Sequence, residues 1–248
     1  KKLVQSQIYA QYPDAEITEV VDYVDEYPKT LPEMYGQGYR VWGTELVLDK
    51  EDAFPIRTYV EFESMEEEQY LDPVSAILEL FGKCKLNERV WMQILARGTG
   101  SDWVKKGRKL VEKLREETKI KTPAPSAEGT GYEYFAPTPG QLDVIKAVER
   151  NISKPGFDTL IRVFYFAPEK VYSTEIPWQG LAGIFKGFAM TQMNTFRHNY
   201  TTWTTIHWSY PPYIFPERRK EARRARLLRY YRERKMPLPS IFSQLEEL

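Results

Sequence analysis

The stretch DPVSAILELFGKCKLNERVWMQILAR, residues Asp72–Arg97, decides the fold of this chain. Apolar residues recur at helical spacing in its first part, from Val74 to Phe81. They then alternate with other residues from Val90 to Ala96, which is the spacing of a strand. The stretch therefore predicts an amphipathic helix that leads into a strand.

A second stretch, PGQLDVIKAVERNISKPGFDTLIRVFYFA at Pro139–Ala167, follows the same plan of a helical apolar face before a β-branched and aromatic run. When the two stretches are laid over each other, Gln93 matches Arg162 inside the strand. Each stretch is followed by another amphipathic segment, which begins near Trp103 in the first and near Trp178 in the second. The repeat predicts an α+β fold of two similar β-α-β-α halves, a ferredoxin-like internal duplication, with a basic helix at the C-terminus.

Composition predicts where these parts begin and end. Lys119–Gly131 contains TPAPSAEGTG, whose Pro, Ser and Gly residues are typical of a linker. Pro211 and Pro212 end the second half, and a charged segment follows them. We expect a first α+β half with acidic N-terminal strands at 1–122, a second α+β half at 123–216, and a basic helix with an extended tail at 217–248.

The remaining elements follow from the same patterns. Helices are expected at Lys1–Gln11, Trp103–Glu117 and Trp178–Arg197. Strands are expected at Glu16–Val24, Tyr39–Leu48, Ile56–Phe62, Tyr132–Ala136 and Tyr200–Tyr210. Because Asp25–Gly38 holds two prolines and two glycines, it is expected to be a loop.

The overall composition is that of a folded protein with unevenly distributed charge. The 248 residues are 42% hydrophobic and 14% aromatic, which is ample for a core and argues against global disorder. The net charge is +0, but acidic residues dominate Asp14–Asp72 and basic ones Arg218–Lys235. A single cysteine, Cys84, excludes an internal disulfide and a cysteine-rich zinc site and fits a reducing compartment.

The motifs of catalysis and cofactor binding are missing from the sequence. It has no GxxxxGK[ST], no GxGxxG and no GxSxG. The nearest glycine-rich turn, Gly98–Asp102, lacks the lysine and serine of a phosphate loop, so Ser101 or Asp102 is interpreted as a helix N-cap. His198 and His207 are nine positions apart and have no cysteine partners, which is not typical of a metal site. We therefore expect no enzyme, no cofactor, no metal and no small-molecule substrate.

The sharpest remaining feature is the segment ERRKEARRARLLRYYRERK at Glu217–Lys235, which predicts a basic helix with interleaved tyrosines. Three partners fit it: nucleic acid phosphates, anionic lipid headgroups, or the acidic N-terminal half of this chain or of a neighbouring subunit. The candidate surface consists of Arg218, Arg219, Lys220, Arg223, Arg224, Arg226, Arg229, Tyr230, Arg232 and Arg234.

Several phrases together resemble the region that precedes the motor in type IV secretion and conjugative-transfer ATPases, especially those of poorly characterised bacteria of candidate phyla. They are SQIYAQYPDAEITEVVDY, VWGTELVLDKEDAFPIRTY, LDPVSAILELFGKCKLNERVWMQILAR, KAVERNISKPGFDTLIRVFYFAP and GIFKGFAMTQMNTF. The resemblance runs from about Ser6 to Phe196. It implies a non-catalytic domain that helps to assemble the ATPase and to join it to the translocation machinery at the inner face of the cell membrane.

The resemblance carries over no ATPase residues, because the sequence has no Walker motif. The chain opens at Lys1 in mid-pattern and ends abruptly at Leu248, so we expect a piece of a longer protein in which a P-loop domain follows. The expected function is an assembly or scaffold domain that positions a translocation ATPase, with copies of itself or other secretion-machine subunits as partners. The alternative is a nucleic-acid-binding module that acts through the arginine-rich helix on DNA.

Overall fold

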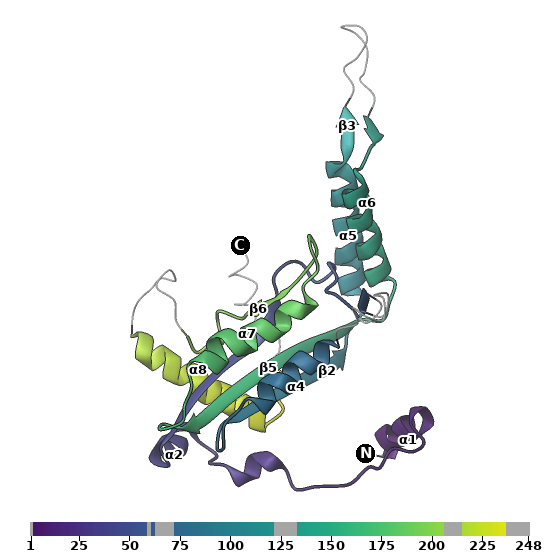
Figure 1. Cartoon of the computed structure of the whole chain (residues 1–248). Coiled ribbons are helices and arrows are strands. Elements are labelled where there is room, and N and C mark those ends of the chain that lie inside the picture. Colours follow the sequence, from purple (N-terminus) through teal and green to yellow (C-terminus); the bar gives the residue numbers. More distant parts are fainter. Residues whose placement is uncertain (1, 59–60, 63–71, 122–132, 206–214, 237–248) are drawn as a thin grey trace, which may run out of the picture.

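The computed structural model describes residues 2–58, 61–62, 72–121, 133–205 and 215–236. The fold is α+β, built on an antiparallel sheet with the strand order β2-β5-β1-β6 (Figure 1). Its strands are β1 (Tyr39–Leu48), β2 (Arg89–Gly98), β5 (Phe157–Pro168) and β6 (Phe196–His198). Because β1 and β2 precede residue 122 and β5 and β6 follow it, both expected halves contribute strands to one sheet.

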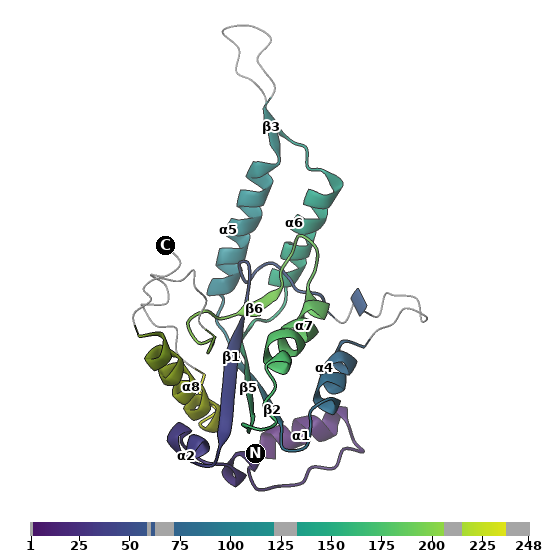
Figure 2. The same ribbon diagram turned by 60° about the vertical axis from the view of Figure 1, so that its left-hand side comes forward.

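Side chains of the central strand β5 alternate between two hydrophobic layers. Phe164 and Phe166 pack with helix α8 (Pro216–Arg232) on one face of the sheet. Val163 and Tyr165 belong to the cluster on the other face, where α7 (Leu181–Ile184) and α4 (Pro73–Gly82) lie. The sheet is therefore the middle of three layers (Figures 1 and 2).

A helical hairpin projects from one end of the sheet (Figure 2). It consists of α5 (Asp102–Glu117) and α6 (Pro139–Ile152), followed outward by the short strands β3 (Lys119–Lys121) and β4 (Glu133–Phe135). The two helices share a small core of their own, with Leu110, Val111, Ile145 and Val148 buried. A Cβ atom built on Gly107 would lie 2.4 Å from Ile152 Cγ2, so glycine is what allows the two helices to approach closely at this point.

The N-terminal arm, defined here as residues 2–22, is separate from the body of the molecule (Figures 1 and 2). It begins with helix α1 (Lys2–Gln11), in which no residue is buried. After a turn at Tyr12–Asp14, the chain runs without regular structure to the 3₁₀ turn η1 (Tyr23–Glu26), where it joins the sheet through Val24.

The predictions of long periodic elements are confirmed. The predicted helix–strand pairs are α4 with β2 and α6 with β5, and the helices expected at Lys1–Gln11 and Trp103–Glu117 are α1 and α5. Strand β1 lies at the predicted Tyr39–Leu48, and β4 lies within Tyr132–Ala136.

Five other predictions are wrong in whole or in part. Glu16–Val24 is not a strand, because no strand in the described ranges pairs with it and its last two residues belong to η1. The expected loop Asp25–Gly38 holds η1 and helix α2 (Leu31–Gly36), which a capping box between Thr30 and Glu33 starts. The strand expected at Ile56–Phe62 is not formed where the structure describes it, because residues 56–58 are irregular and residues 61 and 62 are helical.

The helix expected at Trp178–Arg197 is also shorter and less regular than predicted. A π-helical turn η3 (Ile176–Gly180), α7 and a 3₁₀ turn η4 (Phe185–Phe188) follow one another, and the chain then bends into β6. Residues 200–205 of the strand expected at Tyr200–Tyr210 form turns and bends, and the rest lies outside the described residues, as does His207. In these segments the apolar side chains pack without helical or strand periodicity, so the spacing of apolar residues did not predict the secondary structure correctly.

Candidate functional site

Helix α8 is docked on the sheet through its short apolar patch. Leu227, Leu228 and Tyr231 are buried, and the Tyr231 ring stacks on Trp91 at 5.2 Å between ring centroids. The Tyr231 hydroxyl lies 2.7 Å from that of Tyr23, and burial is the main reason that the pKa of Tyr231 is raised. The helix is thus part of the hydrophobic core rather than a projection from it.

Many of the arginines predicted as a binding surface hold α8 to its own chain. Arg223 donates to the carbonyl oxygen of Trp203 at 2.7 Å, and Arg226 donates to that of Thr201 at 2.9 Å. On the other side, Arg232 pairs with Asp25 at 2.8 Å, and just beyond the helix Arg234 pairs with Asp22 at 2.7 Å. These contacts attach the middle and the C-terminal end of α8 to surrounding loops, and the last two join basic residues to the acidic N-terminal region.

The remaining residues of the predicted surface differ in their exposure and in their contacts. Lys220 and Arg224 pair along the helix with Glu217 and Glu221, at 2.7 Å and 2.5 Å. Arg219 and Tyr230 are half-buried. Arg218 and Arg229 are exposed and lie over the rings of Phe215 and Tyr230, at 5.3 Å and 5.2 Å from the ring centroids. The structure therefore leaves far less of the positive charge facing solvent than the sequence suggested.

Beneath α8 lies a buried polar network that the sequence analysis did not predict. Arg162 of β5 is fully buried and donates through Nε and Nη2 to Glu45 of β1, at 2.9 Å and 2.7 Å. Its Nη1 donates to the side-chain oxygen of Gln93 in β2 at 2.9 Å. Glu45, Arg162 and Gln93 are cross-strand neighbours in three adjacent strands, so the ladder itself brings them together.

The network also binds the end of α8. Arg162 donates to the backbone oxygens of Tyr230 and Lys235 at 3.1 Å and 3.0 Å, and Gln93 Nε2 donates to that of Tyr231 at 3.2 Å. Carbonyls near a helix C-terminus lack intrahelical donors, and a buried guanidinium can supply them. A charged residue inside the apolar run LIRVFYF was the signal in the sequence that could have pointed to this network.

The candidate histidine, cysteine and serine residues of the sequence analysis have structural contacts where the structure describes them. No three His, Cys, Asp or Glu side chains among its residues are placed to hold a metal ion. His198 stacks on Trp203 at 4.4 Å between ring centroids, and its Nδ1 lies 3.1 Å from the Thr44 hydroxyl. Burial raises the pKa of the half-buried Cys84 thiol, which makes it a poorer nucleophile. Ser101 occupies the N-cap of α5 but makes no side-chain cap bond.

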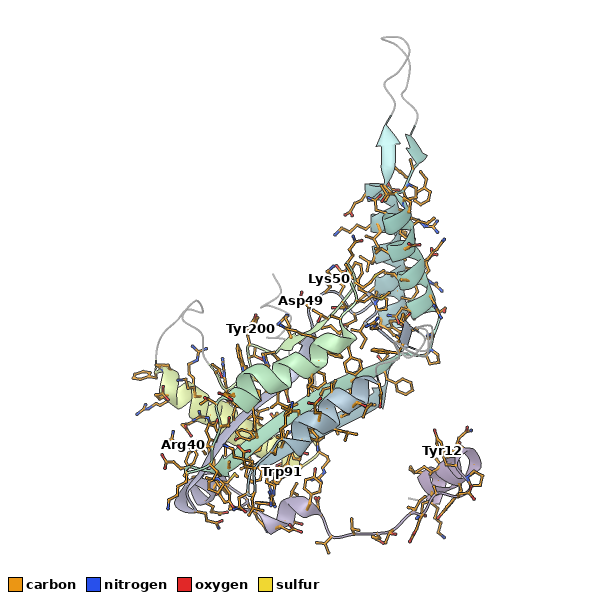
Figure 3. All side chains as sticks on the ribbon, viewed as in Figure 1. Tyr12, Arg40, Asp49, Lys50, Trp91 and Tyr200 are labelled. Atoms are coloured by element: carbon orange, nitrogen blue, oxygen red, sulfur yellow. The ribbon has the colours of Figure 1, made fainter. Side chains whose placement is uncertain are left out.

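A small cavity of about 270 Å³ lies where the helical hairpin meets the loop after β1. Lys50, labelled in Figure 3 beside the hairpin, lines it together with Phe54, Gln141 and Gln192. The Lys50 ammonium donates to the backbone oxygen of Gln192 at 2.8 Å. The buried Asn194 amide holds the same loop through the backbone of Asp49, Lys50 and Phe54. These contacts hold the loop after β1 to the segment that precedes β6, beside the hairpin.

Residues 1–210 match the profile of a protein family described as "Domain of unknown function (DUF8128)". The chain belongs to this family. No curated protein and no solved structure matches the chain. The family match covers the N-terminal arm, the sheet and the helical hairpin, and it ends before α8.

Across the described residues, no helix is both long enough and apolar enough to cross a membrane.

Proposed function

We propose that the chain is a non-catalytic assembly domain that positions a translocation ATPase in a membrane-associated type IV secretion or conjugative DNA-transfer machine. The observation that carries the proposal is that two exposed parts, the N-terminal arm and the α5–α6 hairpin, project from a three-layer body (Figures 1 and 2). Such a body presents contact surfaces to partners while its core stays intact. We infer the type of machine from the resemblance of the arm, β1, α4 and β2 to the region that precedes the motor in these ATPases.

The internal duplication belongs to the same proposal. Gln93 and Arg162, which match when the two repeats are aligned, lie directly opposite each other in the β2–β5 ladder. A local two-fold axis through two antiparallel strands would pair equivalent residues in this way. The surrounding helices differ, because α4 lies on the sheet whereas its counterpart α6 stands in the hairpin (Figure 2). In an experimental structure, Met92 and Ile161 should occupy nearly equivalent strand positions when the two halves are superposed, and unrelated folds in the two halves would contradict a duplication.

Photocrosslinking in cells that carry the transfer machine tests the assembly role. A photoreactive phenylalanine analogue would replace Phe135 near the end of the hairpin or Tyr12 in the arm, both of which are exposed. The matched control position is Tyr200, labelled on the body in Figure 3. We expect Phe135 or Tyr12 to form adducts with a P-loop ATPase or with another subunit of the machine, and Tyr200 to form fewer. Equal adducts from all three positions, or ATP hydrolysis by the purified chain alone, would overturn the proposal.

A further inference from the structure

We propose that the arm segment Glu16–Val21 of one copy adds as a fifth strand to the outer edge of β2 in a second copy, and that two copies exchange arms in this way. This inference rests on the proposed assembly function and names one of the partners, which is the chain itself. It comes from two features, an edge strand and an extended segment, to which no strand of the described residues is paired.

The first feature is the edge strand β2. It is 10 residues long and pairs with β5 on one side. On its other side, no strand among the described residues pairs with it. A long edge strand exposes unpaired N–H and C=O groups, so most proteins keep their edge strands short, place charged residues on them or cover them. Here Ile94, near the middle of the strand, is 60% exposed. The edge is therefore suited to accept another strand.

The second feature is the segment between α1 and η1. Its sequence EITEVV has the β-branched content of a strand, yet it runs without regular structure. Val20 and Val21 are 80% and 84% exposed. Helix α1, which precedes the segment, buries no residue, although isolated helices of its length are marginal in water. If a second protein surface covered the arm, both the exposed valines and the unburied helix α1 would gain contacts.

The charges of the two features are complementary. The stretch Asp14–Asp22 carries acidic residues and no basic one, whereas β2 carries Arg89 and Arg97 and no acidic one. Within its own chain Arg97 pairs with Asp158 at 2.8 Å, at an exposed position where an arm carboxylate could join the pair. Opposite charges across a strand pair stabilise it and help to fix its register. A second copy thus offers the arm a matching edge.

The arm of the structure points away from its own edge strand. It is fixed to the body at Tyr23, whose ring lies 5.6 Å from that of Trp91 in β2. From there it extends outward, and Figure 3 shows Tyr12 well apart from Trp91. Two copies related by a two-fold axis can each reach the edge of the other, which is the geometry of domain swapping.

The test is the mass of the full chain in solution and the hydrogen exchange of its β2 amides. The variant Thr18→Pro/Val21→Pro removes two backbone donors whose N–H groups face opposite edges, so one of them is needed whichever way the strand docks. The matched control, Thr18→Ala/Val21→Ala, keeps both donors. Neither change touches the body, because both positions are exposed in the arm.

We expect the wild type and the alanine control to sediment at or above twice the chain mass of 29.2 kDa, and the proline variant to sediment as one chain. Exchange of the β2 amides should be about ten-fold or more faster in the proline variant. Equal masses for the wild type and the proline variant would overturn the proposal. So would a monomeric wild type with slow β2 exchange, since the arm would then pair with its own edge. The photocrosslinks to an ATPase that test the assembly role do not depend on this result.

Discussion

Arg162 is the charged side chain on which the contact between the sheet and α8 depends. Its side chain and that of Glu45 are 0% and 3% exposed. Replacing Arg162 with Met would leave the Glu45 carboxylate buried without its cation and would remove two bonds to backbone oxygens at the end of α8. We expect Arg162→Met to lower the free energy of unfolding by roughly 3–5 kcal/mol, as for other broken buried pairs. Urea denaturation followed by circular dichroism measures this loss.

The double variant Glu45→Leu/Arg162→Met is the control for that experiment. It removes both charges, so no buried ion is left unpaired, and it should be more stable than Arg162→Met alone. If the two variants unfold at the same urea concentration, the loss is due to packing or to the α8 carbonyls and not to the ion pair.

Tyrosine ionisation at high pH gives a second prediction for single residues. Burial and the hydrogen bond that Tyr35 donates to Glu221 at 2.7 Å raise the pKa of Tyr35 to about 12. Burial also raises the pKa of Tyr165 and of Tyr231. Unfolded tyrosine ionises near pH 10, so these groups favour the folded state below pH 10. Their contribution should be lost as the pH rises from about 10 to 12 and beyond.

Absorbance of tyrosinate near 295 nm, recorded together with the urea midpoint at each pH, checks this prediction. Part of the tyrosine signal should appear only when the chain unfolds. The variant Tyr35→Phe should show a smaller decline of the urea midpoint between pH 10 and 12 than the wild type. A wild-type midpoint that stays constant over this range would contradict the expected linkage.

Among the elements, the α5–α6 hairpin is the one whose geometry depends most clearly on a single glycine. In an exposed helix, Gly→Ala usually stabilises by up to about 1 kcal/mol. At Gly107 the added Cβ would meet Ile152 Cγ2 at 2.4 Å, so we expect Gly107→Ala to destabilise the chain instead, by about 1–3 kcal/mol. The matched control is Gly82→Ala at the end of α4, where nothing lies within 4 Å of the new atom. Thermal unfolding of both variants shows whether each substitution stabilises or destabilises the chain.

Elements that could be predicted from the sequence are those whose burial follows one period. The faces of α4 and α6 and the alternation of β2 and β5 follow from the spacing of their apolar residues. Segments held by individual contacts could not be predicted in this way. The stretch after η4 is shaped by the Asn194 amide and its backbone partners, and such tertiary hydrogen bonds leave no periodic signal in the sequence.

The same limit explains why the candidate binding surface changed. The sequence predicted the charge of α8 correctly, but charge alone does not tell which guanidinium groups have intramolecular acceptors. Arg223 and Arg226 bind carbonyl oxygens of residues 203 and 201, and Arg232 binds Asp25. Those acceptors come from distant parts of the chain and are adjacent only in the fold.

At the scale of the whole molecule, the number of α8 arginines that remain exposed determines how strongly the chain should bind DNA. Each phosphate contact contributes about −0.9 to the slope of log K against log salt concentration on duplex DNA. With Arg218 and Arg229 as the exposed arginines of the α8 surface, we expect weak binding with a slope of about −2. Fluorescence anisotropy with labelled duplex and single-stranded DNA over a salt series measures the slope.

The variants for that experiment follow from the contacts of α8. Arg218→Ala/Arg229→Ala should abolish the binding and leave thermal stability unchanged, because within the described part of the chain neither guanidinium bonds to another element and each lies over a nearby ring. Arg223→Ala/Arg226→Ala should lower stability instead, since it releases the loop at Thr201–Trp203 from α8. A slope of about −6 or steeper would require more cations than the docked helix exposes. If that slope were lost in Arg223→Ala/Arg226→Ala, it would indicate that α8 leaves the sheet to bind DNA, and the nucleic-acid-binding alternative would then replace the scaffold.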